Sequence, residues 1–262
     1  MIIEQIWTGN NGRNFFYMIA CKETGEAAAI DPIDPAKCLA LAKERGWDIT
    51  QVINTHEHGD HIGGNDQVIA ATGAKVVAPK NSAGRIPKFD SEIGEGDTVK
   101  IGRTGELQVL FTPGHTPIHI SLLGHTDRPH LFCGDTVFNA GVGNCNSGDP
   151  ETLYETFASK IAALPDDTLI YPGHDYLANN LGFTLDREPD NARAKELLPT
   201  AESQDPDQAL ITDLGLERQI NTFLRLDSPS VIEALRAKLP AVPKNPDAKT
   251  VFVGLRTLRN SW

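Results

Sequence analysis

The chain has 262 residues, 40% of them hydrophobic and 23% charged, so it can bury one large core or a large domain with a small appendage. Its formal net charge is −11, from 24 Lys and Arg against 35 Asp and Glu. This balance argues against nucleic acid and anionic membranes as partners, but not against a small anionic substrate held by a few basic residues. Four widely spaced cysteines, and the lack of a leader-like or membrane-length apolar run, predict a reducing, cytoplasmic location.

The first two thirds of the chain alternate short apolar runs with amphipathic segments. Runs bounded by Gly, Asn or Pro predict strands at 2–8, 14–21, 26–32, 49–55, 74–79, 106–114, 119–124, 130–138 and 168–176. Helical spacing predicts helices at 34–46, 64–73 and 149–165. Asp34 is a candidate N-cap, Gly46 a helix stop and Pro150 a first helical residue. Residues 91–102 indicate a hairpin.

Strand-like runs disappear after Tyr176, and the remainder of the chain reads as helices and loops. Two groups of strands with helices between and outside them indicate a layered α/β sandwich rather than a simple doubly wound sheet. We therefore expect a catalytic domain at 1–175 and a helical substrate-binding subdomain at 176–262.

The stretch NTHEHGDHIGG places three histidines and an aspartate within six positions. His56 and His58 lie on the same side of an extended segment because side chains alternate, so both imidazoles can reach one point. Asp60 and His61 follow Gly59, where the chain can turn, and can face a second point. So many titratable groups at a strand-to-helix turn would be costly unless they shared a charge partner, which favours divalent metal ions over a merely structural cluster.

Further ligands are expected where later strands end. TPGHT supplies His115, CGDT supplies Asp135 and YPGHD supplies His174, each after an apolar strand and a small residue. Gly63 and Gly64 let the backbone pass close to both metal points. The predicted ligand sets are His56, His58 and His115 for one metal, and Asp60, His61 and His174 for the other, with Asp135 as the bridge.

These motifs, in this order, resemble those of the metallo-β-lactamase superfamily over about residues 1–176. The resemblance implies an αββα sandwich with a dinuclear site along one edge, and every ligand position is filled in this chain. Two divalent metals lower the pKa of a shared water toward 7, and Asp60 could orient the resulting hydroxide. Nitrogen and oxygen ligands without thiolate admit Zn, Fe or Mn.

The last third of the chain, in YPGHDYLANNLGFTLDREPDN, INTFLRLD and LRTLRNSW, is similar to glyoxalase II, the hydroxyacylglutathione hydrolases. This resemblance implies that Tyr176, Arg256 and Arg259 contact glutathione; the alternative for the two arginines is a solvated helix face. Many members of that family carry Lys and Tyr in a GKFYEG-like loop, where this chain has Asn144 and Asn146. The departure implies weaker glutathione binding, a different thiol carrier or another thioester.

The leading prediction is a metal-dependent thioester hydrolase that cleaves S-(2-hydroxyacyl)glutathione, such as S-D-lactoylglutathione, by a metal-bridged hydroxide. The main alternative is a mononuclear-iron persulfide dioxygenase acting on glutathione persulfide, which the chain resembles at His56, His115 and Asp135. The acidic net charge disfavours a third interpretation, an RNA-processing nuclease. Oligomeric state, acyl group and metal identity stay open.

Three other histidines and one cysteine are expected outside the ligand set. His119 is expected to be structural or to support a ligand. His125 and His130 flank a polar turn and are expected at the surface. Cys145, between the two asparagines of the altered loop, is either a reactive thiol or an inert one.

Overall fold

The computed structural model describes residues 1–262. The chain divides into two compact units, which are described separately below. Unit 1 contains Met1–Thr112, Ile118–Gly134 and Tyr171–His174, and unit 2 contains Pro113–Pro117, Asp135–Ile170 and Asp175–Trp262.

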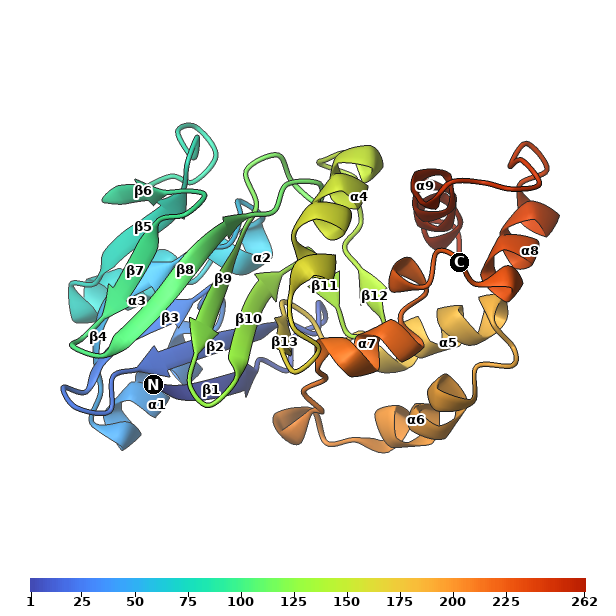
Figure 1. The fold of residues 1–262 in the computed structure, drawn as a ribbon. Helices are drawn as coiled ribbons and strands as arrows, with labels where there is room; N and C mark the ends of the chain where they lie inside the picture. Colours follow the sequence, from blue (N-terminus) through green and yellow to red (C-terminus); the bar gives the residue numbers. More distant parts are fainter. The chain divides into compact units, whose positions relative to one another are not determined.

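A six-stranded sheet in unit 1 has the order β1-β2-β3-β4-β5-β6 (Figure 1). Its strands are β1 (Ile2–Trp7), β2 (Phe15–Ala20), β3 (Glu26–Ile30), β4 (Asp48–Ile53), β5 (Lys75–Pro79) and β6 (Ser91–Ile93). Strands β1, β2 and β3 pair antiparallel, and from β3 to β6 each strand pairs parallel with the next. Ile30 of β3 lies opposite Ile53 of β4. Because parallel strands end at the same edge, the residues that follow β3 and β4 come together there.

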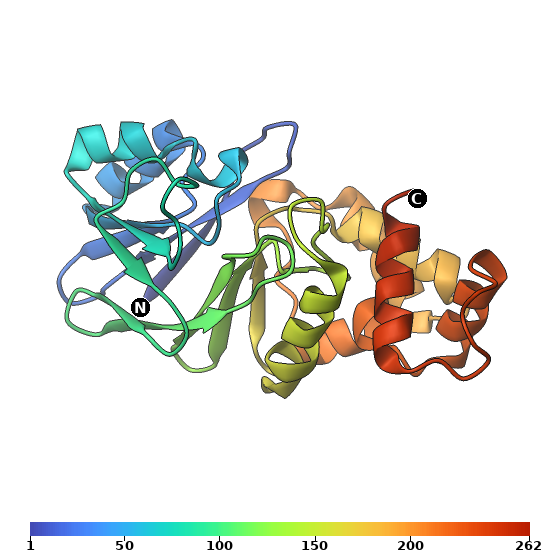
Figure 2. The ribbon, with the colours of Figure 1, turned by 90° about the horizontal axis from the view of Figure 1, so that it is seen from above.

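A five-stranded sheet has the order β13-β10-β9-β8-β7. Its strands are β7 (Thr98–Ile101), β8 (Gly105–Phe111), β9 (Ile120–His125), β10 (Pro129–Gly134) and β13 (Leu169–Pro172). The ring of Tyr17 on β2 lies 5.4 Å from Phe132 and 5.5 Å from Tyr171, and its hydroxyl donates to the carbonyl of Pro172. These contacts show that the two sheets of unit 1 pack face to face, as two layers (Figure 2).

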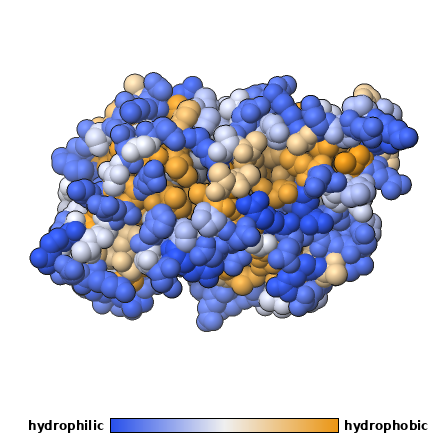
Figure 3. Space-filling model, in the orientation of Figure 1, coloured by the Kyte–Doolittle hydropathy of each residue, from blue (hydrophilic) through white to orange (hydrophobic).

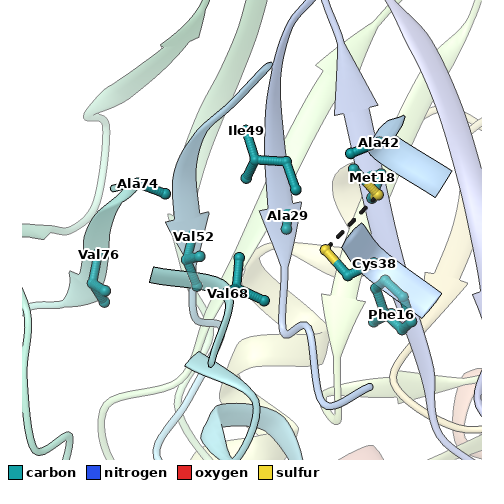
Figure 4. Close-up of a cluster of buried hydrophobic side chains, with 10 residues drawn as sticks. All are labelled: Phe16, Met18, Ala29, Cys38, Ala42, Ile49, Val52, Val68, Ala74 and Val76. Atoms are coloured by element: carbon teal, nitrogen blue, oxygen red, sulfur yellow. Dashed lines mark hydrogen bonds between the residues drawn. The ribbon is translucent and has the colours of Figure 1, made fainter. Parts of the chain in front are cut away.

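Helices α1 (Pro35–Arg45) and α3 (Asn65–Thr72) cover the six-stranded sheet. The apolar cluster between these helices and the sheet includes Phe16, Met18, Cys38 and Val68, all fully buried (Figure 4). Asp34 caps α1 by accepting from the Lys37 N–H, and Gly46 ends the helix in a left-handed conformation, so both predicted helix ends are confirmed. Cys38 acts as a small hydrophobe in this layer.

The predicted hairpin at 91–102 is wrong. A turn joins Gly94 to Asp97, but β6 pairs with β5 in one sheet and β7 pairs with β8 in the other. The turn thus connects two sheets, which local sequence cannot distinguish from a hairpin. The predicted strand at 130–138 ends at Gly134, and β11 (Val137–Phe138) pairs separately with β12 (Gly141–Val142).

Unit 2 consists mainly of helices (Figure 1). Its helices are α4 (Pro150–Ser159), η1 (Ile161–Ala163), α5 (Leu177–Arg187), α6 (Ala192–Ser203), η2 (Pro206–Gln208), α7 (Leu214–Ile220), η3 (Thr222–Leu224), α8 (Pro229–Lys238) and α9 (Ala248–Arg259). Pro150 opens α4, as predicted. Phe252 of α9 packs against Phe157 of α4 and Phe223 of η3, with ring centroids 5.3 and 5.2 Å apart, which anchors the last helix.

The face seen in Figure 3 mixes hydrophilic residues with smaller hydrophobic areas. The large hydrophobic side chains that are exposed are Leu210 and Trp262. No helix combines the length and the apolar composition that crossing a bilayer requires.

Candidate metal centre and substrate pocket

The end of β4 carries the first pair of predicted ligands. Beyond Ile53 the chain stays buried to His56 but bends at Thr55 and His56, and Nε2 of His56 lies 3.1 Å from Nδ1 of His58. Thr55 Oγ1 is 2.6 Å from an Asp31 carboxylate oxygen, which can only accept, so its proton goes there. The hydroxyl therefore accepts from Nδ1 of His56, at 2.9 Å, and leaves Nε2 as a lone pair directed at His58. Two ring nitrogens at this distance are suited to a shared cation.

The short helix α2 (Gly59–Ile62), which the sequence indicated only as a turn, carries the next two predicted ligands. His58 precedes the helix, so Asp60 and His61 lie in its single turn. Oδ2 of Asp60 is 3.9 Å from Nε2 of His61 and 3.4 Å from Nε2 of His174. Ligand atoms of these three residues lie within 4.8 Å of one another, close enough to hold one metal ion.

Two histidines of this cluster are held in one tautomer by acceptors behind them. Nδ1 of His61 donates to Oδ2 of Asp31 at 2.9 Å, and Nδ1 of His174 donates to the carbonyl of Gly12 at 2.6 Å. In the neutral imidazole each Nε2 then carries the lone pair, which is the form that binds a metal. This donor set fits a divalent cation.

Asp31 is a functional residue that sequence reasoning missed. It follows β3, is 4% exposed and has φ of 50°, and it also accepts from the backbone N–H of Thr55 at 2.8 Å. A signal was available, because an aspartate directly after a buried strand resembles the pattern of Asp135 in CGDT. Asn14 was missed as well; its side chain donates to Oδ2 of Asp60 at 3.1 Å.

The two glycines that close the histidine-rich motif pack directly against nearby backbone. A Cβ on Gly64 would lie 1.9 Å from the carbonyl oxygen of Pro32, and one on Gly63 would lie 2.7 Å from that of Gly59. Neither glycine has a positive φ. A side chain at either position would collide with this backbone, where α2 turns tightly and passes against the loop after β3, and the predicted approach to a metal stays a prediction.

The other predicted ligands lie in unit 2. Nε2 of His115 is 3.5 Å from Oδ2 of Asp135, and both side chains are nearly fully buried. Nδ1 of His115 donates to the backbone carbonyl of Asn144 at 2.6 Å, so the neutral ring of this histidine too has its lone pair on Nε2. Gly143 packs directly behind the pair, since a Cβ there would be 1.9 Å from the Asp135 carbonyl oxygen.

The remaining histidines lie outside these clusters. His119 is fully buried, stacks on His56 at a centroid distance of 4.9 Å and bonds Thr112, which matches the supporting role expected for it. The expected surface position of His130 is wrong. It is 6% exposed and contacts Tyr171, because its strand is buried against β13.

A pocket of about 260 Å³ in unit 2 brings together the five predicted substrate residues. It is lined by Phe138, Val142, Asn144, Asn146, Tyr176, Asn180, Arg256, Arg259 and Asn260. Tyr176 packs edge-on against Phe138 at 5.2 Å, which provides an apolar wall beside the polar groups. Polar amides and two arginines dominate the rest of the lining, as suits a polar, anionic ligand.

The two arginines of the pocket differ in environment. Arg256 is 5% exposed, donates through Nη1 to the carbonyls of Val142 and Gly143, and donates through Nη2 to Asn260. Burial lowers the pKa of Arg256 to about 10. Arg259 is only partly buried, and its hydrogen bond to Asn180 is longer, at 3.3 Å. Its guanidinium is thus the more available of the two.

Cys145 is partly buried beside this pocket. Burial raises the pKa of its thiol to about 11, against the opposing effect of nearby Arg256. The thiol is therefore protonated at neutral pH, which favours the inert interpretation over the reactive one.

Residues 23–174 match the metallo-beta-lactamase superfamily, and residues 175–262 match the C-terminal region of hydroxyacylglutathione hydrolases. Hydroxyacylglutathione hydrolases of Polaromonas sp. strain JS666 and Nitrosococcus oceani are 60% and 57% identical to the chain, each over 100% of both sequences. The chain belongs to the hydroxyacylglutathione hydrolase family of the metallo-beta-lactamase superfamily. The crystal structure of ETHE1 from Myxococcus xanthus has a TM-score of 0.69 at 25% identity, covering 98% of this chain and 99% of that one.

Membership in this family confirms the predicted α/β metallo-β-lactamase fold with a helical C-terminal region. It also makes the chain a metal-dependent hydrolase, with His and Asp clusters that suit divalent metal ions. The match to the metallo-beta-lactamase superfamily ends at residue 174, and the match to the hydroxyacylglutathione hydrolase C-terminus begins at residue 175.

Proposed function

We propose that the chain hydrolyses S-(2-hydroxyacyl)glutathione thioesters, such as S-D-lactoylglutathione, to glutathione and a 2-hydroxy acid. The observation that carries this proposal is the set of histidines whose Nδ1 atoms are occupied by fixed acceptors, which leaves Nε2 of His61, His115 and His174 ready to bind metal. The names of the relatives support the glutathione thioester as substrate.

The proposed centre uses two divalent ions, drawn from Zn, Fe or Mn. Asp60, His61 and His174 would hold one ion, and their convergence within unit 1 supports a dinuclear centre over the mononuclear iron of a persulfide dioxygenase. His56, His58 and His115 would hold the other, with Asp135 between the two, by analogy with the superfamily. When bound, such ions activate a water at neutral pH and polarise the thioester carbonyl.

The protein's own residues would orient that chemistry. Asp60 is 46% exposed at its side chain, so one carboxylate oxygen can face the reacting water while Asn14 holds the other. Asp135 is nearly buried beside His115 and would serve as a ligand. No Ser or Cys nucleophile is required, in agreement with the raised pKa of the Cys145 thiol.

The pocket of unit 2 is the proposed site for the thiol carrier. Arg259 would pair with a carboxylate of the carrier, and Tyr176 would contact its peptide. Asn144 and Asn146 would offer hydrogen bonds without charge. Arg256 would complete the pocket, and the 176–262 region would act as the substrate-binding subdomain.

The test is hydrolysis of S-D-lactoylglutathione by purified protein loaded with Zn, Fe or Mn, with metal content measured on the same sample. We expect two metal equivalents and stoichiometric release of glutathione and lactate, with activity lost in His61→Ala and kept in Asp48→Asn, an exposed carboxylate. Metal-loaded protein that leaves the thioester intact, while an authentic hydroxyacylglutathione hydrolase cleaves it, contradicts the proposal. Oxygen uptake with glutathione persulfide and a single bound iron would establish the dioxygenase instead.

The four cysteines are all free thiols, which supports the expectation of a reducing compartment such as the cytoplasm. The acidic net charge supports a small-molecule partner rather than nucleic acid.

A further inference from the structure

Asn14 lies at the end of the loop between β1 and β2, and it is 1% exposed. Its backbone N–H donates to Oδ1 of Asn10 at 3.1 Å. Since a backbone N–H can only donate, the Asn10 side chain must present its oxygen there, and its Nδ2 then donates to Oδ1 of Asn14 at 2.9 Å. The orientation of the Asn14 amide is therefore fixed, with Nδ2 facing away from Asn10.

The Nδ2 group of Asn14 is directed at the cluster of Asp60, His61 and His174. It donates to Oδ2 of Asp60 at 3.1 Å and to the Asp60 backbone carbonyl at 3.1 Å, and it lies 3.4 Å from Nε2 of His174. Oδ2 is the Asp60 oxygen that faces the histidines. A half-exposed aspartate has several side-chain orientations available, and this hydrogen bond selects the one that converges with them.

The same loop also holds His174. The carbonyl of Gly12 accepts from Nδ1 of His174 at 2.6 Å, and Asn14 forms a β-bridge with His174. A Cβ on Gly12 would lie 2.6 Å from Oδ1 of Asn14, so a side chain at that position would have to displace the Asn14 amide. Two of the three clustered ligands are thus fixed by residues 10–14.

We propose that Asn14 is a positioning residue that presets Asp60 and His174 for one divalent ion, and so controls the affinity of that ion separately from the other. The inference rests on the proposed function, in which Asp60, His61 and His174 hold that ion. Hydrogen bonds that orient metal ligands typically contribute roughly 10- to 100-fold to metal affinity.

The experiment titrates chelator-stripped protein with Zn²⁺ against a competing chromogenic chelator, for the wild type, Asn14→Ala and Asn65→Ala. Asn65 is the matched control, because its buried amide is paired with Asn54 and contacts none of the predicted ligands. A His174→Ala titration identifies which dissociation constant belongs to the Asp60 cluster. Melting temperatures of the metal-free proteins are recorded alongside.

We expect Asn14→Ala to weaken Zn²⁺ binding at the Asp60 cluster by about 10- to 100-fold and to leave the other constant unchanged. Its thioesterase kcat should fall at limiting Zn²⁺ and recover at saturating Zn²⁺, with KM unchanged. Asn65→Ala should lower the melting temperature without weakening Zn²⁺ binding at one site more than at the other. The inference would be overturned if both Zn²⁺ dissociation constants of Asn14→Ala equalled those of the wild type. It would also be overturned if Zn²⁺ affinity fell equally at both sites, as a general destabilisation would produce. Failure of the proposed function shows separately, as wild-type protein that does not bind a second Zn²⁺ or does not cleave the thioester.

Discussion

The Asp31 carboxylate lies 2.9 Å from Nδ1 of His61, and both side chains are almost fully buried. The same carboxylate accepts the N–H and the hydroxyl of Thr55, which in turn accepts from His56. One acid therefore fixes the ring orientation of a histidine in each of the two proposed ligand sets.

Replacement of Asp31 should therefore weaken both metals. Asn tolerates the positive φ of this position, but its amide group would oppose at least one of the three donors. We expect Asp31→Asn to lower metal affinity about 10- to 100-fold, measured by chelator competition. Asp48→Asn, at an exposed carboxylate, is the control, and unchanged affinity in Asp31→Asn would refute the role.

The two pocket arginines should separate into one that maintains the loop and one that binds substrate. Arg256→Gln removes donors from the carbonyls of Val142 and Gly143, so we expect a loss of about 2–3 kcal/mol in the free energy of unfolding. Arg259→Gln should change stability little and raise KM for the thioester about tenfold, the effect of one lost charge-assisted hydrogen bond. Urea unfolding and steady-state kinetics measure the two effects, and a KM that responds equally to both changes would contradict the separation.

Substitutions at Asn144 and Asn146 in the substrate loop should strengthen binding of the glutathione thioester. Asn144→Lys with Asn146→Tyr introduces the Lys and Tyr that the sequence resemblance leads us to expect in this loop, and the lysine adds a positive charge to the pocket. We expect KM for S-D-lactoylglutathione to fall several-fold, on the order of the 0.5–1.5 kcal/mol of one hydrogen bond, with kcat unchanged. The single variants show which position is responsible. A KM that does not fall would indicate that the asparagines already suit this carrier.

Glu217 should make stability depend on pH. It is fully buried, and it accepts from the Ala140 N–H, Thr212 and Asn221, while burial raises its pKa from 4.5 to about 7. Because the folded pKa is above the unfolded one, its contribution to stability is fully present below about pH 4.5 and is lost as pH rises through about 7. Relative to Glu217→Gln, the wild type should lose on the order of 3 kcal/mol across this window.

Urea unfolding of the wild type and of Glu217→Gln, between pH 4.5 and just above pH 7, measures this difference in unfolding free energy. Titrations common to the two proteins cancel in the comparison. A difference in unfolding free energy that stays constant with pH would show that Glu217 keeps one protonation state throughout. Glu217 holds Ala140, which has φ of 57°, in the turn between β11 and β12, so the variant also reports on how firmly that hairpin is held.

The grouping of titratable side chains after β4 could be predicted from the sequence because their geometry is local. One turn after Gly59 is enough to gather His58, Asp60 and His61, but the chain bends at Thr55 and His56, and the His56 ring lies 4.1 Å from that of His61. Helix ends at Asp34 and Gly46 were equally local, since capping depends on neighbouring residues. The hairpin at 91–102 failed because the partner of a strand depends on the whole sheet rather than on the turn.

The ligand types and the family were thus determined by the sequence itself, through short motifs whose spacing carries their chemistry. Only the tertiary structure decided how those ligands are held, because the supporting contacts join distant residues. Asp31 reaches His61 across 30 positions, and Asn14 approaches His174 across 160. Burial likewise shifted the pKa values of Arg256 and Glu217. Desolvation depends on everything packed around a side chain, so no local sequence pattern predicts it.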